Sequence, residues 1–309
     1  MNPSFSVVFL TTASGAGYGM LVWLAVLNAA GALPRAAWFG LTAIALALAL
    51  TIAGLLASTF HLGHPERAWR ALSQWRSSWL SREGVMAIAT FPPALLFALA
   101  WALFGAGADV TVALGLAAAA CGALTVFAQG MIYASLKPVR QWHQGGVVPN
   151  FLLLAAFSGV VCLAGLAAFW GAFGAAAWLA IALGVAALAG KLLYWRAIDR
   201  GVPAASLASA TGLGGLGPVR SLEWPHTEEN YLLREMGFVI GRRHAARLRA
   251  IAVALGFLAP LALLALLPFG AAPAGIAAAL VALAGIYVER WLFFAEATHT
   301  VTLYYGREG

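Results

Sequence analysis

A histidine and a glutamate stand at the two ends of one polar loop in an otherwise apolar sequence. His61 closes the second apolar stretch of the chain, and Glu83 opens the third. Ionisable side chains where a helix meets the membrane surface are costly and usually mark functional sites. An imidazole and a carboxylate can both exchange protons at physiological pH. The pair therefore predicts a redox step that moves protons together with electrons, as the oxidation or reduction of a quinone does.

The loop between these two residues has a second interpretation. It also contains His64, four arginines and three tryptophans: Arg67, Arg70, Arg76, Arg82, Trp69, Trp75 and Trp79. Arginine and tryptophan collect at membrane interfaces, where they anchor helices to the headgroup region. An interfacial anchor belt is the alternative, although it does not account for the placement of His61 and Glu83.

The composition identifies the environment of these residues. Of the 309 residues, 62% are hydrophobic and 9% are charged, whereas a soluble domain carries about 25% charged residues. The mean hydropathy is +0.87. These values exclude a disordered chain, a disulfide-stapled secreted domain and a nucleic-acid-binding protein. The sequence predicts an integral membrane protein.

Eight apolar stretches are each long enough to cross a bilayer, which takes about 20 residues. The predicted fold is an all-α bundle of eight transmembrane helices that forms a single domain over residues 1–309. The predicted spans are 5–30, 36–60, 84–104, 110–136, 149–170, 175–195, 250–269 and 274–294.

The basic residues predict the orientation of the bundle. With eight spans, both termini lie on one side together with the loops 61–83, 137–148 and 196–249. Seventeen of the eighteen Lys and Arg residues lie at or near this side, and only Arg35 lies on the other. Because basic residues are enriched in cytoplasmic loops, we expect both termini and the three long loops to face the cytoplasm.

Two short motifs carry a family resemblance. Residues 61–68 read His-Leu-Gly-His-Pro-Glu-Arg-Ala, and residues 80–83 read Leu-Ser-Arg-Glu. The chain resembles the membrane anchor subunit of the bacterial dimethyl sulfoxide reductase family, whose eight-span members carry H-L-G-x-P-x-R-A after span two and L-S-x-E at the start of span three. Gly63, Pro65 and Arg67 match fixed positions of the first motif, and His64 occupies a variable one.

The resemblance implies a non-catalytic subunit in the bacterial inner (plasma) membrane that serves electron transport in anaerobic respiration. Such an anchor holds a molybdopterin catalytic subunit on the membrane. It exchanges electrons between menaquinone or ubiquinone and a ferredoxin-like iron–sulfur subunit. The resemblance places quinol binding on His61 and Glu83.

No metal cofactor is expected on this chain itself. An iron–sulfur cluster needs about four ligands, and the sequence contains only Cys121 and Cys162. The six histidines all fall at span ends or in loops, which argues against an axially ligated haem. Any cluster must therefore belong to a partner.

Other candidate residues lie near the same side. Arg290, near the end of the last span, is a candidate quinone ligand, because family members have a basic residue there. The alternative is a structural pairing with the adjacent Glu289 or with Glu83. Tyr133 lies where the family has an aromatic residue, and Arg70 with Arg67 is expected to favour an anionic surface.

The loop 196–249 is the predicted docking segment for a soluble partner. Tyr231, Met236 and Phe238 are its candidate contact residues, and the basic run 242–249 is expected to contact lipid headgroups. The length of this loop resembles that of the anchors of cytoplasmic sulfite-oxidising relatives, which would reduce quinone rather than oxidise quinol.

Two other function classes fit the sequence less well. A small-solute transporter is expected to have broken helices and charges near the midplane, and no central charge is apparent in spans one to seven. A purely structural anchor leaves His61 and Glu83 unexplained. The run 212–217 matches G-x-G-x-x-G, but no strand precedes it, so a dinucleotide site is not predicted. The glycines at 15 and 19 predict close helix packing.

Overall fold

The chain is an all-helical membrane bundle. The computed structural model describes residues 1–60, 62–172, 174–201, 205–223, 236, 240–267 and 272–305. Within these residues, eight helical units are long and apolar enough to cross a membrane. This confirms the predicted fold class and the number of spans. Helices are required because lipid offers no hydrogen-bond partners to the backbone.

The spanning units follow the chain in order. They are α1 (Phe5–Ala29), α2 (Ala37–Thr59), α3 (Trp79–Phe104), α4 (Asp109–Ala134), α5 (Val147–Ala168), α6 (Gly174–Arg200), the unit Ala245–Leu264 and α12 (Ala272–Ala295). The seventh unit consists of α10 (Ala245–Val253), the π-helical turn η3 (Ala254–Leu258) and α11 (Ala259–Leu264). The short elements outside the spans are η1 (Pro65–Gln74), α7 (Leu207–Thr211), η2 (Gly214–Leu216), α9 (Ile240–Arg243) and η5 (Thr300–Tyr305).

Some helices extend beyond the predicted spans. Helix α3 begins at Trp79 rather than at residue 84, because the Ser78 side chain accepts a hydrogen bond from the backbone N–H of Ser81 and caps the helix. Glu83 therefore lies within the helix, one turn from its start. Helix α6 continues to Arg200, and α10 begins at Ala245. The loop between them is therefore shorter than the predicted 196–249. The prediction ended these spans early because the last residues of α6 and the first residues of α10 are polar.

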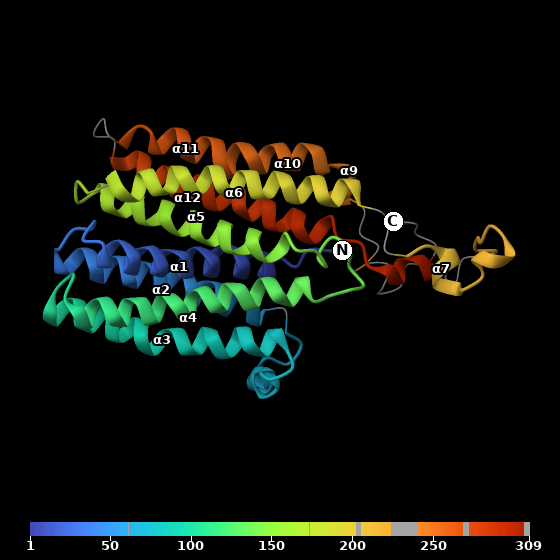
Figure 1. Ribbon diagram of the computed structural model, residues 1–309, viewed down its shortest axis with the longest axis horizontal. Coiled ribbons are helices and arrows are strands. Elements are labelled where there is room, and N and C mark those ends of the chain that lie inside the picture. The colour runs from blue at the N-terminus through green and yellow to red at the C-terminus, as the bar shows by residue number, and fades with distance from the viewer. Residues whose placement is uncertain are drawn as a thin grey trace.

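Helices α1 and α5 form the centre of the bundle. They have the largest buried fractions of the eight spans, and α1 packs against α2, α4, α5 and α12. In Figure 1 the long helices run side by side along the long axis of the molecule. The central position of α1 and α5 brings polar residues of α1, α4, α5 and α12 around one interior site.

Small residues let α1 and α5 approach closely. A Cβ atom at Gly19 would overlap the backbone of Ala155, and one at Gly159 would overlap the backbone of Gly19 and Met20. The predicted close packing is confirmed at Gly19, whereas a Cβ at Gly15 would lie 3.7 Å from the Ala155 Cβ, an ordinary contact. Such close van der Waals contacts drive helix association in lipid, because the hydrophobic effect does not favour helix–helix contact over helix–lipid contact there.

Substitution of Gly159 by valine is expected to destabilise the bundle. The side chain would force α1 and α5 apart, and overpacking of this kind costs about 1–3 kcal/mol or more. The midpoint of thermal unfolding in detergent measures the effect. Gly145→Ala is the control, because no atom lies within 4 Å of a Cβ there. Equal stability of the two variants would contradict the packing role.

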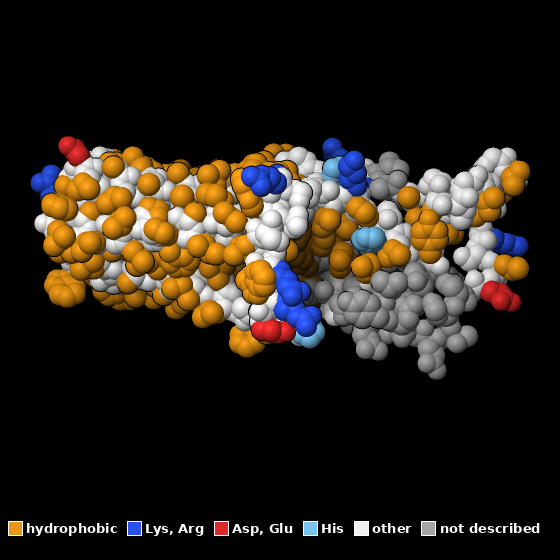
Figure 2. Space-filling model, turned by 90° about the horizontal axis from the view of Figure 1, so that it is seen from below, with side chains coloured by type: hydrophobic (Ala, Val, Ile, Leu, Met, Phe, Trp, Pro, Cys, Tyr) orange, Lys and Arg blue, Asp and Glu red, His pale blue; other side chains and the backbone are white. Residues whose placement is uncertain are grey.

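Both ends of the described chain lie at the same end of the bundle. The amino-terminal nitrogen donates a hydrogen bond of 2.7 Å to the Ala297 carbonyl, and the Thr300 N–H donates to the Pro138 carbonyl at 3.1 Å. Figure 1 shows η1, α7 and the marked N-terminus at this end. In Figure 2 hydrophobic side chains cover most of the left part of the surface, and most charged side chains lie in the middle and on the right.

Candidate functional site

Glu83 is a buried carboxylate near the loop-bearing end of the bundle. Its side chain is 7% exposed and accepts a hydrogen bond of 2.9 Å from the Gln129 amide of α4. The start of α3 is fixed by η1, because the Ser81 hydroxyl donates to the Ala71 carbonyl and Leu72 packs on Gly84. The sequence motif that ends in Glu83 thus places a carboxylate between α3 and α4.

The other motif residues lie on the surface. His61 lies outside the described residues. Pro65 opens η1, in which no residue is buried. His64 lies 3.0 Å from the Glu66 carboxylate, and the Nε atom of Arg67 lies 3.6 Å from it. These contacts are exposed and therefore weak.

Three of the four arginines, Arg70, Arg76 and Arg82, lie over tryptophan rings. Arg70 lies over the Trp69 ring at 5.7 Å, and Arg82 lies over the Trp79 ring at 4.2 Å. This arrangement fits an interfacial belt next to Glu83, as the alternative interpretation of the loop predicts. Arg67 and Arg70 of η1 are exposed. Their positive charges therefore lie on the surface at the loop-bearing end of the bundle.

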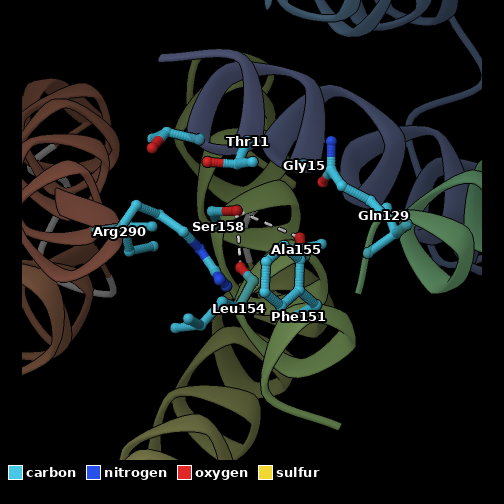
Figure 3. Close-up of a pocket in the computed structure, with 11 residues that line it drawn as sticks. Thr11, Gly15, Gln129, Phe151, Leu154, Ala155, Ser158 and Arg290 are labelled. Carbon is cyan, nitrogen blue, oxygen red and sulfur yellow. Dashed lines mark hydrogen bonds between the residues drawn. The ribbon is translucent and has the colours of Figure 1, made fainter. Parts of the chain in front are cut away.

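A small cavity with both polar and apolar lining residues lies in the interior, next to the Gln129 side chain that binds Glu83. Its volume is about 10 Å³, which is about the space that one water molecule needs and far less than an aromatic ring needs. Figure 3 shows how its residues from four helices converge. They are Thr11, Thr12 and Gly15 of α1, Val126 and Gln129 of α4, Phe151, Leu154, Ala155 and Ser158 of α5, and Ile286 and Arg290 of α12.

Gln129 links this cavity to Glu83. Its amide nitrogen donates to Glu83, and the same side chain lines the cavity that Arg290 lines from the other side. The predicted site residues Glu83 and Arg290 are therefore brought to the same region of the bundle, with Gln129 between them. Among the described residues, no direct contact joins Glu83 to Arg290.

Arg290 is paired with its neighbour in sequence. The side chain is 3% exposed, and its Nε atom lies 3.3 Å from the Glu289 carboxylate. Glu289 also forms an ion pair with Lys191 of α6, and both of these side chains are 1% exposed. Of the two partners considered for Arg290, the structure shows Glu289 and not Glu83.

Tyr133 packs in an aromatic cluster beside the cavity. Its ring stacks on Phe151 with centroids 5.5 Å apart, and it contacts the ring of Trp142 at 5.2 Å. Phe151 lines the cavity. The predicted aromatic position therefore lies next to the cavity. Trp142 is fixed by a hydrogen bond of 3.0 Å from its indole nitrogen to the Phe293 carbonyl.

Two buried polar residues do not stand out as site residues in the sequence. Lys191 falls among the basic residues of the loop side, and Gln129 falls inside an apolar span. Both lie inside the bundle, at 1% and 3% exposure. The sequence could have indicated both residues through their polarity, because a polar side chain within an apolar span needs a partner inside the protein.

The basic run 242–249 does not behave as predicted at its end. Arg249 donates two hydrogen bonds of 2.7 and 2.9 Å to Asp199 of α6, and one of 2.8 Å to Glu296. Its guanidinium is therefore occupied by α6 and the end of α12 and does not serve as a headgroup contact. Burial raises the pKa of Glu296 above its usual value, and the nearby Arg249 only partly opposes this shift.

The predicted docking residues lie largely outside the described chain. Tyr231 and Phe238 are not among the described residues. Met236 is described and is half-buried. Their proposed contact with a soluble partner therefore stays a prediction.

Comparisons with known proteins agree over the whole chain. The family model "DMSO reductase anchor subunit (DmsC)" matches residues 1–306. The chain is also similar to one of the subunits of the sulfite dehydrogenase of Allochromatium vinosum. The two are 37% identical over an alignment that covers 99% of each chain.

Proposed function

The chain belongs to the family of DMSO reductase anchor subunits, and on that premise we propose that it binds a quinone beside Glu83 and exchanges electrons with a partner iron–sulfur subunit. The family assignment makes it a multi-pass membrane protein associated with other subunits of an oxidoreductase complex. Four further points belong to the proposal: the quinone site, the molybdopterin catalytic subunit, the location of this chain in a bacterial inner membrane, and the binding of both soluble partners on the cytoplasmic side of that membrane.

One observation carries the proposed site. The Glu83 carboxylate is buried at the loop-bearing end of the bundle, and the amide of Gln129 holds it in place. A buried carboxylate held at a helix end near the membrane surface is a suitable proton donor or acceptor. A quinone needs such a group, because its oxygens gain or lose protons when the ring gains or loses electrons.

The polar interior behind Glu83 supports the same site. Gln129, the small cavity and Arg290 extend a polar environment across the bundle from Glu83. The cavity is too small for the quinone ring itself. We therefore place the ring on the loop side of Glu83, with menaquinone or ubiquinone as the substrate and with His61, identified from the sequence motif, as its second ligand. Arg290 then influences the site through its charge and not by direct contact with the ring.

The relative favours one direction of electron flow. Similarity to a sulfite dehydrogenase subunit supports a complex in which the catalytic partner oxidises sulfite and the anchor passes the electrons to quinone. In this reaction sulfite, water and quinone become sulfate and quinol. Reduction of the quinone takes up two protons, and His61 and Glu83 are proposed to deliver them. The opposite direction, quinol oxidation for a reductase, is the alternative within the family.

Replacement of His61 by alanine is expected to abolish quinone-dependent turnover and leave the complex assembled. The reason is that a proton-transferring group typically contributes about 10²–10⁴-fold to the rate. The experiment uses the complex purified through this chain, with partners identified by mass spectrometry and the molybdenum content determined. Turnover is then followed with sulfite and a ubiquinone analogue, and with dimethyl sulfoxide and a quinol.

His64→Ala is the matched control for this experiment. His64 lies in the same motif, is exposed and contacts only Glu66 among the described residues. We expect its turnover to equal that of the wild type. Unchanged turnover in His61→Ala would refute the quinone site, and a chain that purifies without molybdenum or iron would refute the partners.

A further inference from the structure

We propose that Lys191 is a positioning residue for the quinone site: it neutralises Glu289, so that the positive charge of Arg290 remains available to the cavity beside Gln129 and Glu83. This inference rests on the proposed quinone site. It assigns a function to an ion pair in the core of the bundle that the motifs do not include.

The first step is the pairing of Lys191. Its ammonium group forms an ion pair with the Oε1 atom of Glu289, and both side chains are 1% exposed. The ammonium nitrogen also lies 4.2 Å from the ring centroid of Tyr194 and 5.1 Å from that of Trp195. Aromatic faces stabilise a cation that has lost its water. The Glu289 carboxylate and the two aromatic faces therefore favour the charged form of Lys191 and oppose the effect of its burial.

The second step is the weaker hold of Glu289 on Arg290. The contact is made by the Nε atom at 3.3 Å, which is longer than the 2.7–2.9 Å or so that is usual for a charge-assisted hydrogen bond. The guanidinium carbon lies 3.8 Å from the ring centroid of Phe151. In Figure 3 the guanidinium end extends among the cavity residues toward Leu154 and Phe151. Glu289 therefore belongs to Lys191 more than to Arg290.

The third step is the balance of charge. The buried cluster holds two cations, Lys191 and Arg290, and one anion, Glu289. The neighbouring anion Glu296 is paired with Arg249, which also binds Asp199. Of all these charged residues only Arg290 lines the cavity that Gln129 connects to Glu83, so its positive charge is the one that faces the cavity. Charges act strongly in a low-dielectric interior. A fixed positive charge there favours an oxygen that gains electron density, as a quinone oxygen does during reduction.

Removal of Lys191 would change this balance without removing Arg290. In Lys191→Met, Glu289 and Arg290 form a neutral pair. The negative charge of Glu289 then offsets the positive charge that Arg290 presents to the cavity. We expect quinone-dependent turnover to fall about tenfold, less than for loss of a group that touches the substrate. In the double variant Lys191→Met/Glu289→Gln the leftover positive charge returns, and we expect turnover within about threefold of wild type.

The rescue separates electrostatic positioning from a structural role. The thermal unfolding midpoint of each variant is measured beside its turnover, because removing both partners of a buried pair also relieves an uncompensated charge. Electrostatic positioning predicts that turnover falls in Lys191→Met and returns in the double variant independently of the midpoint. A purely structural ion pair predicts that turnover only follows the midpoint. That result would overturn the proposal, and so would full turnover in Lys191→Met. Lys191→Arg, which keeps the charge, is expected to stay close to wild type. If Lys191→Met fails to assemble, Lys191→Gln replaces it, and normal turnover in that variant would equally overturn the proposal.

The same measurements distinguish this inference from the proposed function. Each purified complex is assayed with its quinone substrate and with a soluble redox dye that reacts directly with the partner subunits. Dye turnover is expected to be equal in all variants. A wild-type complex that reacts with the dye but not with quinone refutes the quinone site. A wild-type complex that uses quinone, with no rescue in the double variant, refutes only the role of Lys191.

Discussion

Replacement of Glu83 by glutamine is expected to lower quinone-dependent turnover by about 10²–10⁴-fold. Glutamine has nearly the shape of glutamate, and its carbonyl oxygen can still accept the hydrogen bond that Gln129 donates at 2.9 Å. The start of α3 and its packing on α4 are therefore retained. What is lost is the ability to bind and release a proton next to the quinone oxygen.

The test compares turnover and assembly in the same preparation. The complex is purified through this chain, its subunit stoichiometry is determined, and its rate with a quinone analogue is measured. Glu66→Gln is the control, because Glu66 lies in the same loop but is 63% exposed and contacts only His64 and Arg67 among the described residues. If Glu83→Gln keeps the wild-type rate, Glu83 is a structural residue and the proposed site is wrong.

Replacement of Glu289 by glutamine alone is expected to lower the stability of the bundle by about 3–5 kcal/mol. The substitution leaves Lys191 and Arg290 as two buried cations without the anion that lies between them. Removing one partner of a buried ion pair leaves an uncompensated charge, which costs far more than the pair itself contributes. The midpoint of thermal unfolding in detergent should fall well below that of the wild type.

The matched control is the ion pair of Arg249 with Asp199. Asp199 lies at the end of α6, the helix that also carries Lys191. The Asp199 side chain is 55% exposed, so Asp199→Asn is expected to cost at most about 1 kcal/mol. The double variant Lys191→Met/Glu289→Gln should recover part of the stability lost in Glu289→Gln, because one buried cation, Arg290, then lacks Glu289 instead of two. Equal unfolding midpoints for Glu289→Gln and Asp199→Asn would contradict a buried charge cluster.

The sequence by itself determined the environment, the number of spans and the family. Hydropathy is a property of consecutive residues, and a span needs about 20 of them, so eight spans can be recognised without any tertiary contact. The two motifs at 61–68 and 80–83 are linear as well. The glycines at 15 and 19 predicted close packing for the same reason, because their spacing defines one face of a single helix.

Helix ends were predicted less well than helix centres. Helix α3 begins five residues before the predicted residue 84, and α6 ends at Arg200 instead of near residue 195. Hydropathy ends where polar residues begin, but a helix continues as long as caps and ion pairs satisfy its last turns. Ser78 supplies such a cap to α3. Arg249 joins the ends of α6 and α10 through Asp199.

The tertiary structure alone decided which buried polar side chains meet. Glu83 and Gln129 are 46 positions apart in the chain, and Lys191 and Glu289 come from helices that are not neighbours in sequence. Whether such residues touch depends on the depth and rotation of each helix, and both are set by packing against other helices. In lipid a polar side chain must find its partner inside the bundle, so the sequence indicates that a partner exists, and only the packed helices identify it.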